Sequence, residues 1–163
     1  MSTVYVIGTL DTKEAELRYA VERVRAAGAQ AVLVDISTTP STASADVDAA
    51  TVARHHPNGA GAVLGHSDRG RAVTAMSEAL TAFLTLRQDI GAVLGLGGGG
   101  NTSMVTAAMR ALPIGTPKLM VSTMASTRLN RSACPWGSRL RWATFAAVNR
   151  LAAPFGHAAT HAP

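Results

Sequence analysis

Glycine, hydroxyl and charged residues gather in four short segments of this 163-residue chain. Glycine lets backbone amides approach an anion closely, and hydroxyl, ammonium and carboxylate groups bind phosphate oxygens, sugar hydroxyls or Mg²⁺. Together these residue types favour a site for a phosphate-bearing ligand. The segments are Gly8-Thr9-Leu10-Asp11-Thr12-Lys13, Asp35, Gly97-Gly98-Gly99-Gly100-Asn101-Thr102 and Ser122-Thr123-Met124-Ala125-Ser126.

The glycine run is the most specific of the four. Five glycines stand within the six positions from Gly95 to Gly100, more than a tight strand-to-helix turn needs. A helix that opens at Asn101 or Thr102 presents free N–H groups and the positive end of its dipole to an anion. The alternative is a turn that binds nothing, and we favour the anion site.

The spacing around the run argues against two familiar nucleotide motifs. Gly95, Gly97 and Gly100 satisfy G-x-G-x-x-G, but the dinucleotide fingerprint needs an acid about 20 residues later, and no Asp or Glu follows Asp89. The lysine of a P-loop is missing as well, because Asn101-Thr102 stands in its place. ATP or a related nucleotide, with or without Mg²⁺, is therefore favoured over NAD.

The first segment and Asp35 have structural and functional interpretations. Thr9 or Asp11 can cap a helix, with Lys13 a solvated residue of its first turn. A lysine is unfavourable near a helix N-terminus, however, and makes sense there if a phosphate lies nearby. Asp35 is the natural acid for a ribose hydroxyl or a magnesium-bound water. No histidine or cysteine spacing predicts a metal site, and nothing identifies a nucleophile or a general base.

Compact apolar runs alternate with helical patterns over residues 1–126, which predicts an α/β domain with a mainly parallel, Rossmann-like sheet in three layers. Ligands of such sheets bind beyond the carboxyl ends of the strands, where all four segments then fall. The expected strands are Thr3–Ile7, Ala31–Ile36, Ala92–Leu96 and Lys118–Ser122. The expected helices are Thr12–Ala27, a helix capped by Asp68, and Thr102–Ala111, with a loop over Ser37–Ser44.

Residues 127–163 differ in composition and form a separate arginine-rich tail. Residues 1–126 hold ten basic and ten acidic side chains, so the whole net charge of +5 lies in this tail. Nucleic acid is therefore not expected as a partner of the domain itself. One amphipathic helix is expected over Arg139–Ala152. The single cysteine, Cys134, and the absence of a signal or membrane segment favour the cytoplasm and no membrane partner.

The chain resembles a nucleotide-binding domain family typified by the N-terminal part of the tomato mosaic virus resistance protein, with uncharacterised bacterial members. The resemblance covers about residues 1–126 and implies a Rossmann-like fold that binds ATP. The matching text is Val6–Lys13, Val34-Asp35, Asp68-Arg69-Gly70, Ala75-Met76, Gly95–Gly98, Ala108–Gly115 and Pro117–Ser126.

This sequence departs from the family in two places. The family's glycine loop reads roughly G-G-S-G-G-T, whereas Gly99 and Asn101 replace its serine and last glycine here. The family also continues into a second domain after Ser126, so a truncated or frame-shifted chain is expected. Two alternatives stay open: an enzyme acting on a small phosphorylated or carboxylated substrate through Asp11 and Lys13, and a module whose basic tail binds a protein or RNA. A protein partner or a homo-oligomer is compatible with all of these.

Overall fold

The computed structural model describes residues 2–39, 42–64, 68–123 and 140–144. Strands and helices alternate along the chain, as expected for an α/β domain. In chain order the elements are β1 (Thr3–Gly8), α1 (Leu10–Ala26), β2 (Gln30–Asp35), α2 (Ala49–Ala53), α3 (Gly61–Leu64), α4 (Arg69–Thr85), β3 (Ile90–Gly97), α5 (Gly99–Ala111), β4 (Lys118–Ser122) and β5 (Leu140–Thr144).

All strand pairs of the sheet are parallel, and the strand order is β2-β1-β3-β4-β5. The four predicted strands are confirmed, each within two residues at either end. The chain leaves β1 towards β2 on one side and returns to β3 on the other. The strand order therefore reverses between β1 and β3, and such a reversal is where open α/β sheets bind their ligands.

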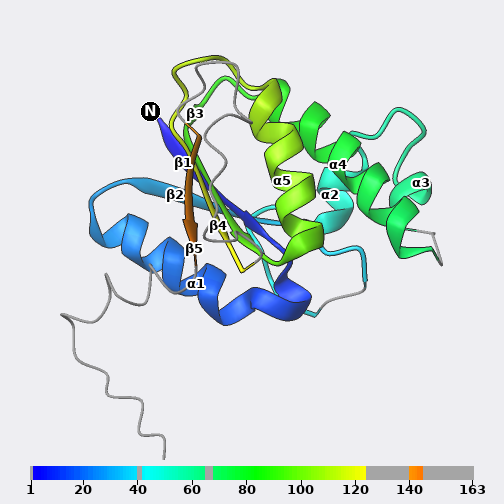
Figure 1. Cartoon of the computed structure of the whole chain (residues 1–163), viewed down its shortest axis with the longest axis horizontal. Coiled ribbons are helices and arrows are strands. Elements are labelled where there is room, and N and C mark those ends of the chain that lie inside the picture. The colour runs from blue at the N-terminus through cyan, green and yellow to red at the C-terminus, as the bar shows by residue number, and fades with distance from the viewer. Residues whose placement is uncertain (1, 40–41, 65–67, 124–139, 145–163) are drawn as a thin grey trace, which may run out of the picture.

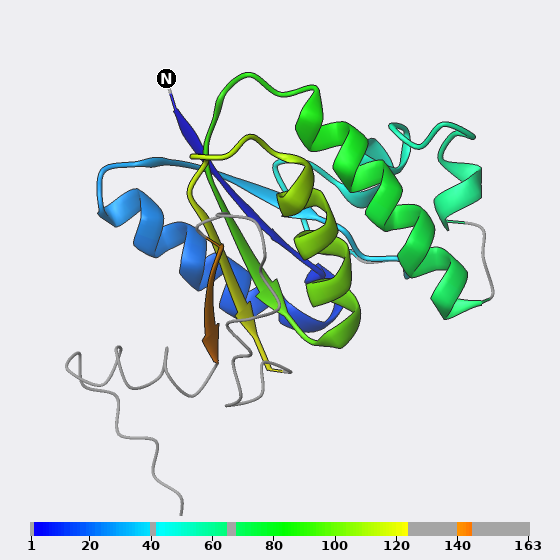
Figure 2. The same ribbon diagram turned by 45° about the horizontal axis from the view of Figure 1, so that its top comes forward.

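Helices cover both faces of the sheet, which gives the three predicted layers (Figures 1 and 2). Helix α1 lies on one face, where Leu17 and Val21 pack against Val6 and Leu33. Helices α4 and α5 lie side by side on the opposite face, next to the short α2 and α3. The apolar face of α4 is buried there: Ala72, Met76, Ala79, Leu80 and Phe83.

Local signals fix the ends of the two longest helices. Asp68 is the N-cap of α4, and its Oδ1 accepts a hydrogen bond from the Arg71 N–H at 3.0 Å, as predicted. Helix α1 ends just before Gly28, whose φ of +82° suits glycine and stops the helix. Glu14 and Arg18, one helical turn apart, form an ion pair at 2.8 Å on the exposed surface.

Helix α1 begins earlier than its apolar pattern suggests. Its first turn starts at Leu10, and the backbone then kinks at Lys13, whose φ of −133° is not helical. The regular helix after this kink coincides with most of the predicted Thr12–Ala27 segment. The kink lets the first turn lie across the end of β1, beside the loop that follows β2.

Three expectations about local structure are wrong or incomplete. Residues Leu140–Thr144 form β5, parallel to β4, instead of part of a helix over Arg139–Ala152; the remainder of that segment lies outside the described residues. Helix α5 begins at Gly99 and not at Asn101 or Thr102, because Gly99 and Gly100 adopt helical geometry. Helices α2 and α3 were not predicted, since five and four residues are too short to show a helical period.

No helix in the described part of the chain is both long and apolar enough to cross a membrane.

Candidate functional site

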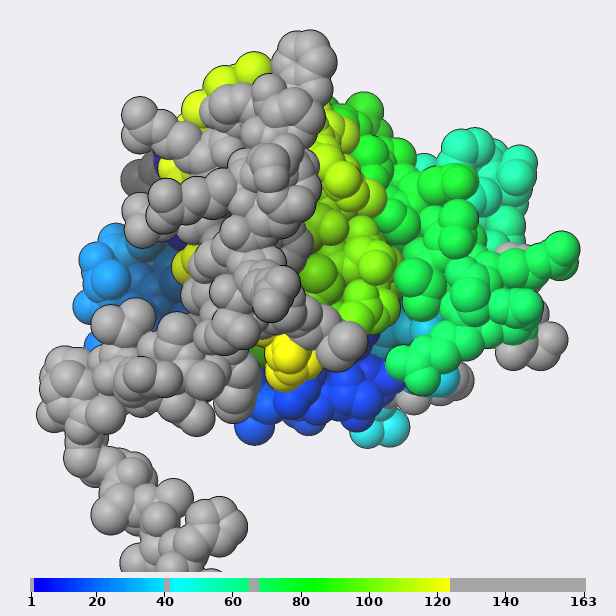
Figure 3. Space-filling model, viewed as in Figure 1, coloured from blue at the N-terminus to red at the C-terminus, as the bar shows by residue number. Residues whose placement is uncertain are grey.

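A cleft of about 310 Å³ lies where β1 and β3 end, at the reversal of strand order. In Figure 3 the first turn of α1, coloured blue, lies beside the end of β4 in yellow and residues of α5 in yellow-green. Four segments line the cleft: Thr9, Asp11 and Thr12 after β1; Thr38 and Thr39 after β2; Arg69, Ala72 and Val73 on α4; and Gly98, Gly99, Gly100, Asn101 and Met104 after β3.

The N-terminus of α5 opens into this cleft. Gly98 is its N-cap and has no side chain with which to satisfy the first-turn amides. The Thr102 N–H donates to the Gly98 carbonyl at 2.8 Å, which is the first hydrogen bond of the helix. The N–H groups of Gly99, Gly100 and Asn101 come before this bond and have no carbonyl partner within the helix. They form a set of backbone donors at the positive end of a 13-residue helix.

The glycines of the run divide into two groups. None of those from Gly97 to Gly100 has a positive φ, so left-handed geometry is not the reason for glycine here. A Cβ on Gly97 would collide with the Asn101 side chain. A Cβ on Gly98 would meet only Thr123 Oγ1 at 3.7 Å, and one on Gly100 only Val73 Cγ2 at 3.7 Å. Packing thus requires glycine at 97 and leaves room for a larger residue at 98 and 100.

Four backbone donors of the first predicted segment, the amides from Leu10 to Lys13, are already engaged. The Leu10 N–H donates to Asp35 Oδ1 at 3.1 Å, and the Asp11 N–H donates to Ser37 Oγ at 3.2 Å. The next two amides, of Thr12 and Lys13, both bond to the Thr9 carbonyl. The residues after β1 therefore offer side chains to the cleft, and the glycine loop after β3 offers backbone N–H groups.

Asp35 is 4% exposed and does not line the cleft. Its Oδ1 accepts three hydrogen bonds, from the Leu10 N–H, the Ser37 N–H at 2.9 Å and the Ser37 hydroxyl at 2.6 Å. Neither Thr9 nor Asp11 caps α1 through its side chain: Thr9 occupies the N-cap position without such a bond. Asp35 instead supplies that cap from the neighbouring strand.

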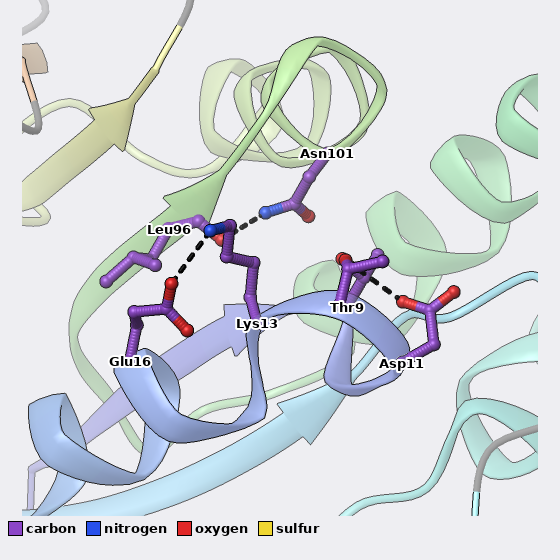
Figure 4. Close-up of polar contacts among 7 residues, drawn as sticks. Thr9, Asp11, Lys13, Glu16, Leu96 and Asn101 are labelled. Carbon is purple, nitrogen blue, oxygen red and sulfur yellow. Dashed lines mark hydrogen bonds and ion pairs between the residues drawn. The ribbon is translucent and has the colours of Figure 1, made fainter.

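The Lys13 side chain is not among the residues that line the cleft. Its Nζ forms an ion pair with Glu16 Oε1 at 2.7 Å, and both side chains are partly buried (Figure 4). The hydrogen bond from Lys13 lowers the pKa of Glu16 below its usual range. The two residues of the open enzyme alternative, Asp11 and Lys13, thus face different surroundings, and only Asp11 lines the cleft.

The end of β4 supports the glycine loop from the side. Ser122 is buried, and its hydroxyl shares a 2.7 Å hydrogen bond with the Thr102 hydroxyl. The Thr123 N–H donates to the Gly97 carbonyl at 3.2 Å, while its side chain is exposed beside Gly98. Ser122 and Thr102 therefore hold the first turn of α5 in place, and Thr123 lies at the edge of the loop.

Several residues of the cleft were not predicted from the sequence. Thr38 and Thr39 lie in the loop that follows β2, so the position rule that selected Asp35 also points to them. Arg69 is the only basic side chain among the lining residues, and the sequence marks it only by its place after the cap residue Asp68 and within the matching segment Asp68-Arg69-Gly70. Ala72, Val73 and Met104 form an apolar wall that helical periodicity assigns simply to packing.

The described residues contain no group of three or more His, Cys, Asp or Glu side chains able to hold a metal ion by themselves. The cleft instead combines backbone donors, one guanidinium, one carboxylate and several hydroxyls. This arrangement suits binding of an anion that also carries hydrogen-bonding groups. It provides no activated nucleophile among the lining residues.

Comparison with known proteins assigns the chain to a family. Residues 2–133 match the N-terminal domain of an uncharacterised protein family, UPF0261. The chain belongs to this family. A UPF0261 protein of Rhizobium meliloti is 54% identical over 126 residues, covering 77% of this chain and 32% of the relative. The ToMV resistance protein Tm-1 of tomato is 39% identical over 142 residues, covering 76% of this chain and 19% of the relative.

The predicted family is thereby confirmed, with its bacterial members and its tomato relatives. The chain spans about a third of the length of the bacterial UPF0261 relatives and about a fifth of the tomato proteins. The shared domain contains every residue of the cleft. Nucleotide binding by this domain stays a prediction.

Proposed function

We propose that this UPF0261 domain binds ATP or a closely related nucleotide, with its phosphates against the first turn of α5. The observation that carries the proposal is the set of uncapped amides of Gly99, Gly100 and Asn101, which open into a cleft at the reversal of strand order. The place of the cleft in the sheet and its backbone N–H donors both favour a phosphate, because parallel α/β sheets bind phosphates at such helix N-termini.

The electrostatics of the cleft support an anion on its α5 side. The dipole of a helix N-terminus contributes roughly 0.3–1 kcal/mol towards an exposed anion, and up to about 2 kcal/mol when the site is partly buried. Arg69 adds a full positive charge from the start of α4, and its planar guanidinium can bond two phosphate oxygens at once. These two sources of positive potential come from different elements and act on the same cleft.

The rest of the cleft is compatible with a nucleoside. Val73 is partly exposed and offers an apolar side chain against which a base can pack, while the lining residues Ala72 and Met104 are almost fully buried. ATP is favoured over NAD because no acidic residue follows Asp89, and the dinucleotide fingerprint needs one after its glycines. The name of the tomato relative describes resistance to a virus, and we do not extend that role to this chain.

Calorimetric titration of the full chain with ATP, ADP and NAD, with and without Mg²⁺, tests the proposal. ATP should bind more tightly than NAD. Gly98→Val should lower ATP affinity at least about tenfold, or ~1.4 kcal/mol, because its methyl groups crowd the anion-binding amides. The Cβ of the new side chain meets only Thr123 Oγ1, at an ordinary contact distance of 3.7 Å, so the fold should survive.

A matched control is Gly61→Val, because a Cβ at Gly61 meets no atom within 4 Å and the residue lies outside the cleft. This variant should bind ATP like the wild type. Unchanged ATP affinity in a folded Gly98→Val protein would contradict the proposal, as would NAD binding equal to or tighter than ATP binding.

A further inference from the structure

We propose that the cleft takes its anion together with a Mg²⁺ ion, and that Asp11 is the protein ligand of this ion. The inference rests on the proposed function and specifies the form of the ligand. Asp11 and Arg69 are the two charged side chains among the residues that line the cleft. A carboxylate in the same cleft repels a bare polyphosphate, and a divalent cation between the two turns this repulsion into attraction.

The surroundings of Asp11 suit a hard cation. The Thr12 hydroxyl donates to Asp11 Oδ1 at 3.2 Å, and the Thr39 hydroxyl donates to Asp11 Oδ2 at 2.5 Å. Each carboxylate oxygen has two lone pairs, so each keeps one for a further partner. The two threonines thereby fix the orientation of the carboxylate without occupying it. Mg²⁺ typically takes one or two protein carboxylates, phosphate oxygens and several waters, so three acidic ligands are not required.

Asn101 provides an independent indication of the same ligand. Its side chain is 5% exposed, and its Nδ2 donates to the Leu96 carbonyl. Its Oδ1 is buried and accepts no hydrogen bond. Among the described residues it is the only buried side-chain oxygen or nitrogen without a hydrogen-bond partner. Figure 4 shows Nδ2 on the side of Leu96 and Oδ1 on the side of Thr9 and Asp11.

This unpaired acceptor needs a donor, which a fully ionised phosphate does not have. Water bound to Mg²⁺ has strongly polarised O–H groups and can donate to both Asn101 Oδ1 and Asp11. A hydrated Mg²⁺ between the phosphates and Asp11 therefore satisfies a buried acceptor that the anion alone leaves unpaired. The sequence favoured Asp35 for this role, but the three donors on Asp35 Oδ1 and its burial leave Asp11 as the acid of the cleft.

Binding of ATP and of inorganic tripolyphosphate, each in Mg²⁺ and in EDTA, tests the inference in the full chain. Tripolyphosphate carries the phosphates without a ribose. In the wild type, Mg²⁺ should raise the affinity for both anions about tenfold. Asp11→Asn should abolish this gain for both and leave the affinities in EDTA unchanged or slightly higher. Glu14→Gln is the matched control: it removes an exposed acid of the same helix outside the cleft and should keep the full gain.

Binding of Mn²⁺ in the presence of tripolyphosphate, followed by the loss of the free-ion electron paramagnetic resonance signal, gives a second readout. The wild type should retain Mn²⁺, and Asp11→Asn should not. An Asp11→Asn protein that keeps the Mg²⁺ gain overturns the inference. So does one that loses affinity for ATP alone, since Asp11 then contacts the ribose. If the wild type binds both anions equally with and without Mg²⁺, the inference fails and the proposed function stands. If it binds neither anion, both fail.

Discussion

The Asp35 carboxylate accepts a hydrogen bond from the Leu10 N–H at 3.1 Å, across 25 residues of sequence. This bond joins the end of β2 to the first turn of α1 and satisfies one of the free amides of that helix. Helix α5, which starts at the end of the adjacent β3, has no such partner at its first turn among the described residues. The two helix N-termini at the cleft therefore differ: side chains of the protein accept hydrogen bonds from the first amides of α1, whereas the first amides of α5 can donate to a ligand.

Asp35→Ala should destabilise the domain through this connection. The change leaves the buried Leu10 and Ser37 donors without an acceptor, at a cost of about 2–4 kcal/mol in the free energy of unfolding. Asp68→Ala, which removes the exposed cap of α4, should cost only about 1 kcal/mol. Urea unfolding followed by circular dichroism compares the two. Equal losses would show that Asp35 does not hold the two elements together.

Alanine at Gly97 should lower the stability of the domain, whereas alanine at Gly98 should lower its affinity for ATP. At Gly97 the added methyl group displaces the Asn101 side chain from the Leu96 carbonyl, and such overpacking costs about 1–3 kcal/mol. At Gly98 the methyl group has room, so the unfolding free energy should stay within about 1 kcal/mol of the wild type while ATP affinity falls. Thermal melting and calorimetry measure both effects. A Gly98→Ala protein that is less stable but binds ATP like the wild type would show that Gly98 is needed for packing and not for ATP binding.

Arg69→Gln should weaken ATP binding because it removes the one guanidinium of the cleft. A charge-assisted contact contributes about 1.5–3 kcal/mol, so the dissociation constant should rise by roughly 10-fold to 100-fold. Arg71→Gln is the control, since Arg71 lies one residue beyond Gly70 on the same helix and does not line the cleft. Titration of both variants at low and high salt gives the result. An equal effect of the two changes would indicate a general charge effect instead of a contact.

Tyr5 should make the stability of the domain depend on pH above 10. Burial, followed by the hydrogen bond to Asp89, raises the pKa of Tyr5 from 10.0 to about 12. Between these values the unfolded chain loses the phenolic proton and the folded chain retains it, so the free energy of unfolding falls as pH rises. Tyr5→Phe should remove this part of the decline. Urea unfolding at pH 9, 10, 11 and 12 tests it; identical declines in both proteins would show that other groups cause the loss.

The sheet was predictable because a parallel strand that is buried on both faces appears in the sequence as a short, nearly continuous apolar run. Compact apolar runs such as Thr3–Ile7 and Ala31–Ile36 identify β1 and β2 without any tertiary information. Strand β5 was not predictable, since the apolar residues of Arg139–Ala152 also fit a helical period. Only its pairing with β4 decides between the two structures.

The candidate site was predictable in position but not in the role of each residue. The rule that ligands lie beyond the carboxyl ends of strands predicts that Thr9, Asp11 and the glycine loop lie close together, and these residues line one cleft. It could not tell which acid faces the cleft, because Asp11 and Asp35 both follow strands. The hydrogen bonds of Asp35 to Leu10 and Ser37 separate them, and these bonds join segments that are distant in sequence. Arg69 reaches the cleft from α4 and has no strand-end signal at all.

The most direct test of anion binding at α5 is a titration of ¹⁵N-labelled protein with ATP, followed by the backbone amide signals in NMR spectra. Anion binding at α5 should give the largest shifts at the amides of Gly99, Gly100 and Asn101, which have no partner in the helix. The amides of Leu10 and Asp11 should change little, since Asp35 and Ser37 already accept their hydrogen bonds. Shifts centred on Leu10 and Asp11, or no shift at Gly99–Asn101 on saturation with ATP, would contradict it.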